Sequence, residues 1–138
     1  GLNVFTIFPK LLIPMAVYAL VAYSDAFFGG EGASMLTNPL FTLGLPSGEW
    51  AVSASDLILT LALVMLFIEM VGSASSGTSS LLNHGLSMAT LLVGILLFLL
   101  VPVFATSTFF LLIVMSLLDV VAGFTVTAIS ARRDLGAG

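Results

Sequence analysis

Charged side chains are scarce in this chain of 138 residues: three are basic and seven acidic, together 7% of the sequence, whereas 59% of the residues are hydrophobic. A water-soluble domain has roughly a quarter of its residues charged. The mean hydropathy of +1.25 therefore predicts one integral membrane domain, 1–138. Three basic residues exclude nucleic acid as a partner, and the absence of cysteine excludes disulfides and thiolate metal sites.

Four apolar stretches, 9–28, 50–71, 81–101 and 107–130, are each about as long as the 20 residues that a helix needs to cross the bilayer. Their runs are continuously apolar rather than alternating, which favours helices over a barrel. The sequence predicts an all-α fold, an antiparallel four-helix bundle with four transmembrane helices. The first stretch is longer than a signal-peptide core and carries Tyr18, Tyr23 and Asp25 near its end, so we interpret it as a retained membrane helix.

The basic residues all lie near the two ends of the chain. Lys10 lies at the very start of the first stretch, and Arg132 and Arg133 follow the fourth. By the positive-inside rule, we expect an inner-membrane location with both termini cytoplasmic. Trp50 is expected to anchor the second helix at the outer interface, and the Ser/Gly-rich segment 72–80 is predicted to be a flexible inner loop.

The predicted outer loop, 29–49, is long and carries many apolar side chains, among them Leu40, Phe41 and Leu43. A loop of this kind is expected to lie on the bilayer interface or to cap the bundle, because free solvation would expose an apolar patch. A binding lid is the alternative interpretation.

Small and polar residues form one stripe on each predicted helix. In the fourth helix, Ser116, Asp119, Gly123 and Thr127 recur at helical spacing. Such stripes are typical of packing faces between membrane helices. Asp119 lies near mid-membrane by helical rise, where a charge is costly, and no basic residue is expected at its depth. It is either a neutral structural carboxyl or a group that ionises when water reaches it.

The remaining ionisable groups lie nearer the membrane surfaces. Asp25 and Asp56 are expected to share an outer layer, and Glu69 and His84 an inner layer that allows them to pair. The candidate polar or ion pathway consists of Asp119, Asp56, Asp25, Glu69, His84 and Ser116. Packing and interfacial roles for the same residues remain open.

Two functions follow from these patterns. The first is an accessory, assembly or scaffold protein whose polar stripes pack against copies of itself or a larger membrane complex. The second is a unit that conducts or transports protons or cations. We expect no enzymatic activity, no cofactor and no metal site, because no nucleophile has a matched base and no paired ligand motif occurs. The expected partners are the lipid bilayer and other membrane subunits.

Overall fold

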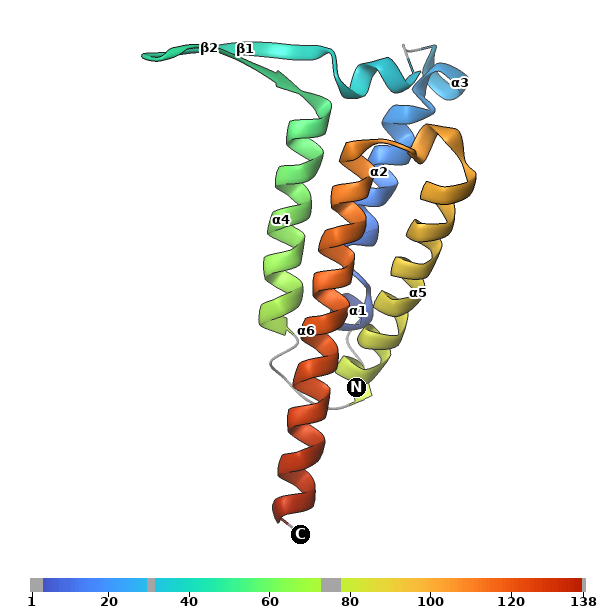
Figure 1. Ribbon diagram of the computed structural model, residues 1–138, viewed down its shortest axis with the longest axis vertical. Coiled ribbons are helices and arrows are strands. Elements are labelled where there is room, and N and C mark those ends of the chain that lie inside the picture. The colour runs from blue at the N-terminus through green and yellow to red at the C-terminus, as the bar shows by residue number, and fades with distance from the viewer. Residues whose placement is uncertain (1–3, 30–31, 73–77, 138) are drawn as a thin grey trace.

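The computed structural model describes residues 4–29, 32–72 and 78–137. Figure 1 shows an elongated arrangement of helices with a β-hairpin across one end. The elements are, in chain order, α1 (Val4–Ile7), α2 (Leu12–Ala22), α3 (Ser24–Phe28), the 3-10 turn η1 (Gly32–Leu36), β1 (Pro39–Leu45), β2 (Gly48–Ser53), α4 (Ala54–Gly72), α5 (Thr78–Leu100), the 3-10 turn η2 (Pro102–Phe104) and α6 (Ser107–Ala137). Of the predicted inner loop, 72–80, residues 73–77 lie outside the described part of the chain.

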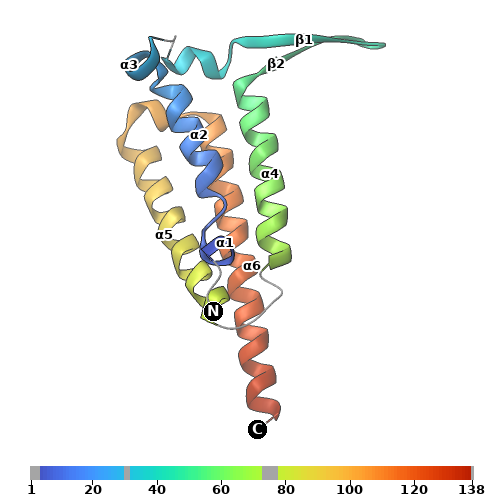
Figure 2. The same ribbon diagram turned by 180° about the vertical axis from the view of Figure 1, so that it is seen from behind.

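The helices α2, α4, α5 and α6, here called the helical body, run roughly parallel or antiparallel to one another (Figures 1 and 2). α6 packs against α4, α5 and α2. Within the described residues, three helices are long and apolar enough to cross a membrane: Ala54–Gly72, Leu81–Leu100 and Ser107–Arg133. These helices support a membrane location for the chain.

The first predicted membrane helix, 9–28, is not continuous. It is divided into α2 and α3 at Tyr23, which has the non-helical angles φ −104° and ψ 18°. α2 has 11 residues, about 16 Å of helix, so it is too short to cross about 30 Å of hydrocarbon alone. No proline or glycine marks this break, so the sequence predicts one continuous helix over this apolar segment.

The predicted outer loop is ordered by a two-stranded antiparallel sheet, so the all-α prediction was wrong at this point. β1 and β2 pair from Leu45–Gly48 to Pro39–Ser53, with a register shift between Pro39 and Phe41. Gly48 closes the turn at φ 139°, a backbone region that favours glycine. β2 also includes Trp50, so α4 begins at Ala54 and not at the tryptophan as predicted.

The core of the helical body lies between α2, α4 and α6. Tyr18, Phe109 and Leu112 are fully buried there. Tyr18 packs on the rings of Phe104 and Phe109, with centroid distances of 5.6 and 5.1 Å. Large exposed apolar side chains cover the outer faces of the helices, as expected where lipid is the surrounding solvent.

Candidate functional site: a buried polar cluster

Lys10 and Glu69 form a buried ion pair between the turn before α2 and the last turns of α4. Lys10 Nζ lies 3.5 Å from Glu69 Oε2, and the two side chains are only 6% and 3% exposed. The backbone N–H of Lys10 donates to Glu69 Oε1 at 2.9 Å. Lys10 Nζ also donates to the carbonyl of Phe5 at 2.8 Å and lies 4.5 Å above the Phe5 ring. These extra contacts offset part of the desolvation cost of the pair.

Asn83 connects this ion pair to α1 and α5. Its Nδ2 lies 3.1 Å from the carbonyl oxygens of both Ile7 and Phe8. The same nitrogen lies 3.2 Å from Glu69 Oε2 and 3.4 Å from Oε1. One amide group therefore binds the end of α1 to α4, and the Lys10, Glu69 and Asn83 side chains together hold four chain segments at one end of the helical body.

Asp119 lies on α6 beside this network and is 6% exposed. It is near enough to Glu69 and Lys10 for both charges to act on its carboxylate, and it faces the Ser87 hydroxyl of α5. Ser87 Oγ and Ser116 Oγ are buried and make no hydrogen bond of regular geometry within the described part of the chain. Ser116 lies one turn from Asp119 on the same face of α6. We call Lys10, Glu69, Asn83, Ser87, Ser116 and Asp119 the buried polar cluster.

The buried polar cluster has more acid than base. Glu69 and Asp119 are two carboxylates that share the neighbourhood of one ammonium group, that of Lys10. A charge within the membrane costs about 3 kcal/mol or more unless it is paired or hydrated. The cluster therefore places carboxylate and hydroxyl oxygens side by side, and these groups can bind a proton or a water molecule. Within the described residues, no group of three or more His, Asp or Glu residues could hold a metal ion.

His84 contacts α6 rather than Glu69, its expected partner. A Cβ atom placed on Gly123 would lie 2.8 Å from His84 Nδ1, and the His84 ring lies 6.5 Å from that of Phe124. Nδ1 is buried without a hydrogen bond to any described residue. The inner-layer pairing of Glu69 with His84 is thus replaced by the contacts of Glu69 with Lys10 and Asn83.

Small residues set how closely α5 and α6 approach each other. Gly123 accommodates the His84 ring, and a Cβ atom on Gly94 would lie 3.6 Å from Ile113 and 3.3 Å from the Met15 side chain of α2. Close packing at small residues is typical of membrane helices. This approach brings Ser87 and Asp119 together.

Asp56 lies at the opposite end of the helical body and forms a capping box with Ser53. The backbone N–H of Ser53 donates to Asp56 Oδ2 at 3.0 Å, and the backbone N–H of Asp56 lies 3.3 Å from Ser53 Oγ. Reciprocal bonds of this kind satisfy donors at the start of a helix. The "SASD" segment is therefore the start signal of α4.

Asp25 also lies at this end, in α3, and is exposed. Its Oδ1 accepts the backbone N–H of Ala26 at 3.0 Å. The carboxylate packs against Gly32, where an added Cβ would lie 3.1 Å from Asp25 Cγ. Asp25 and Asp56 thus have separate partners, and within the described part of the chain the two carboxylates do not contact each other.

Aromatic packing fills the interior between Asp119 and the hairpin end. Tyr18, Phe104 and Phe109 are in mutual ring contact. The Tyr18 hydroxyl lies 2.8 Å from the carbonyl of Val103 and 2.7 Å from Thr106 Oγ1. An aromatic layer therefore lies between Asp119 and the hairpin end, and the polar pathway stays a prediction.

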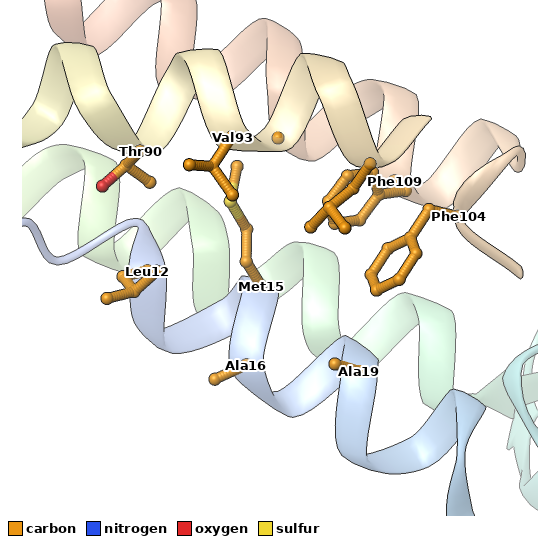
Figure 3. A pocket seen from close by; sticks show the side chains of 10 residues that line it. Leu12, Met15, Ala16, Ala19, Thr90, Val93, Phe104 and Phe109 are labelled. Atoms are coloured by element: carbon orange, nitrogen blue, oxygen red, sulfur yellow. The ribbon is translucent and has the colours of Figure 1, made fainter. Parts of the chain in front are cut away.

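An apolar groove of about 170 Å³ lies between α2, α5 and α6. Figure 3 shows Met15 reaching from α2 towards Val93 of α5, with Phe104 and Phe109 at one end and Thr90 at the other. Thr90 donates its hydroxyl to the carbonyl of Leu86 at 2.9 Å. The groove therefore presents hydrocarbon and no free polar group, so it adds no chemistry to the cluster.

Lys10 and Asn83 were not predicted to belong to a functional site. Lys10 was interpreted only as a basic residue that flanks the first membrane helix. Asp119 was expected to have no basic residue at its depth, yet Lys10 acts on it. The sequence contains part of the signal for the Lys10–Glu69 pair, because the predicted spans place both residues on the same side of the membrane. The turn at 9–11, which carries Lys10 into the interior, has no comparable sequence signature.

No protein-family model, no curated protein and no solved structure matches this chain.

Proposed function

We propose that this chain is a small scaffold or accessory protein of the inner membrane, with four crossings and both termini cytoplasmic. Segment 4–28 provides the additional crossing as a broken helix, because α1 and α3 lie at opposite ends of the helical body (Figure 1). Arg132 and Arg133 are exposed at the α1 end, and the positive-inside rule directs that end to the cytoplasm.

The length of α6 carries this proposal. Its 31 residues make about 46 Å of helix, whereas the hydrocarbon core is about 30 Å thick. Figure 1 shows its last turns standing beyond the neighbouring helices. This extension presents Arg132, Arg133 and the apolar Leu135, which is 83% exposed.

The buried polar cluster supports the same function mechanically. It holds the N-terminal segment, α4 and α5 together at the end from which the α6 extension emerges. A partner that binds the extension would therefore contact a helix whose base is held in place by the buried polar cluster. The chemistry of the extension fits an acidic surface on another subunit of a membrane complex, because two adjacent guanidinium groups bind carboxylates well.

Purification in a mild detergent tests the proposal. Wild-type protein is expected to retain a defined set of membrane proteins in constant stoichiometry. The double variant Arg132→Glu/Arg133→Glu should lose them, whereas the control Glu49→Lys, a charge reversal at the hairpin end, should keep them. Equal amounts of each variant in the membrane fraction must be verified first. Retention of the same partners by the double variant would contradict a role for the extension.

A second function, movement of protons or small cations, is favoured by one observation: Asp119 faces the buried hydroxyl of Ser87, and its own helix adds the unpaired hydroxyl of Ser116. The aromatic layer of Tyr18, Phe104 and Phe109 would have to open for conduction. Proton or sodium flux into proteoliposomes that is abolished by Asp119→Asn, and retained by the control Glu49→Gln, would establish this function in place of the first.

A further inference from the structure

The β-hairpin has two chemically different faces. In an antiparallel pair, residues directly opposite each other point to the same side, and alternate residues along a strand share a face. The register pairs Phe41 with Val52 and Leu43 with Trp50. One face, here called the apolar hairpin face, therefore consists of Phe41, Leu43, Leu45, Trp50 and Val52.

The other face carries Thr42, Gly44, Glu49 and Ala51, and Leu40 lies at the register shift between Pro39 and Phe41, outside this alternation. The hairpin's charged side chain, Glu49, is thus on the side opposite the apolar hairpin face. This separation is that of an amphipathic strand pair with one face buried and one face in water. A hairpin free in solution would gain nothing from placing Phe41, Leu43 and Trp50 on one side.

The described chain does not cover the apolar hairpin face beyond its base. Val52, where β2 meets α4, is 2% exposed, but Phe41, Leu43, Leu45 and Trp50 are between 44% and 47% exposed. Figures 1 and 2 show both strands projecting sideways past α4, across the direction of the helices. An isolated two-stranded hairpin is only marginally stable in water, so this one needs a surface to lie on.

The orientation of Val52 identifies which way the apolar hairpin face is turned. Val52 is buried where β2 runs into α4, and burial at this junction favours an orientation in which the face that carries it is directed towards the helical body. The hairpin lies across one end of that body, where helices long enough to cross a membrane begin. The same face, continued outward, is therefore turned towards the membrane that surrounds the helices.

We propose that the hairpin is a membrane-surface anchor whose apolar face lies in the headgroup region of the lipid leaflet beside α4. The helix that follows the hairpin, α4, also exposes large apolar side chains, among them Leu57 and Val64. Trp50 then lies at the depth where tryptophan is enriched in membrane proteins, and Glu49 lies in water. The anchor fixes the tilt and depth of the helical body from one side.

The native chain contains a suitable probe, since Trp50 is its one tryptophan. In vesicles of zwitterionic lipid, lipids that carry bromine at graded acyl depths are expected to quench Trp50 most strongly when the bromine is shallow. The emission maximum should shift to longer wavelength when Phe41 and Leu43 are both replaced by Ser. Emission typical of water, with no quenching by any brominated lipid, would overturn the proposal.

A matched pair of neighbouring positions gives the sharper test. The chain has no cysteine, so Leu43→Cys and Thr42→Cys can each carry one environment-sensitive fluorophore. Aqueous iodide is expected to quench the label at position 42 several-fold more than the label at position 43. Equal access at both positions would overturn the proposed orientation. A circular dichroism spectrum and thermal midpoint equal to those of the unlabelled protein verify that each variant is folded.

Dilution distinguishes lipid from a protein occupant. Protection of the label at position 43 should persist when the protein-to-lipid ratio is lowered several-fold, because lipid is always in excess. Protection that is lost on dilution would show that a second copy covers the face, and would overturn the proposal. Neither result depends on the α6 extension, so this inference and the proposed scaffold role can fail separately.

Discussion

Lys10 and Glu69 are 59 positions apart, and Glu69 accepts the backbone N–H of Lys10 at 2.9 Å while its second oxygen lies 3.5 Å from the ammonium group. The carboxylate thus binds the chain before α2 through both its main chain and its side chain. Since the pair is buried, each charge depends on the other for its stability in the interior.

Removal of one member of this pair is expected to be strongly destabilising. Glu69→Ala leaves the Lys10 ammonium buried without its carboxylate, and breaking a buried pair costs about 3–5 kcal/mol. Thermal unfolding in detergent micelles, followed by circular dichroism, should show a midpoint well below that of wild type. The double variant Lys10→Met/Glu69→Leu removes both charges and should recover much of the loss. A double variant as unstable as Glu69→Ala would contradict the ion-pair interpretation.

The capping box at the start of α4 predicts a smaller effect. Asp56→Ala should lower stability by about 1 kcal/mol, a typical value for the loss of a cap, because the backbone N–H of Ser53 loses its acceptor. Asp25→Ala is the control, since that exposed carboxylate lies outside α4, accepts the backbone N–H of Ala26 and packs against Gly32. Equal midpoints for Asp56→Ala and wild type, measured by thermal unfolding, would argue against a capping role.

The membrane character of the chain and three of its long helices could be predicted from hydropathy alone, because lipid imposes apolar runs of fixed length. The hairpin could also have been predicted from the sequence. Phe41-Thr42-Leu43-Gly44-Leu45 alternates with the period of a strand, and a Pro-Ser-Gly turn follows it. Interpretation of 29–49 as one apolar loop overlooked that alternation.

The buried polar cluster was only partly predictable. Helical spacing placed Ser116 and Asp119 on one face of α6, and both are buried. The contacts of Lys10 with Glu69 depend on a turn at 9–11 between two helices, α1 and α2, and such long-range contacts leave no periodic pattern in a sequence. Membrane depth estimated from the rise of straight helices therefore places Lys10 at the membrane surface.

Tyr18 supplies a test of the aromatic layer. Its hydroxyl bonds to the Val103 carbonyl and to Thr106 across the body. Tyr18→Phe keeps the ring contacts but leaves that carbonyl without this donor, at a cost of about 1–3 kcal/mol. We expect a lower thermal midpoint without loss of helical content. Thr106→Ser, which keeps the hydroxyl that bonds to Tyr18 and accepts the backbone N–H of Phe109 at 3.2 Å, should cost less than Tyr18→Phe.

The approach of α5 to α6 at Gly123 predicts a steric effect with an internal control. Gly123→Ala places a Cβ atom 2.8 Å from His84 Nδ1, and overpacking of this kind costs about 1–3 kcal/mol. Gly85→Ala, one residue from His84 on α5, meets open space and should be neutral or stabilising by up to about 1 kcal/mol, because alanine favours helix. Thermal unfolding should thus separate two identical substitutions, and His84→Ala should suppress the effect of Gly123→Ala. If the two glycine variants unfold at the same temperature, the close contact between His84 and Gly123 does not limit helix packing.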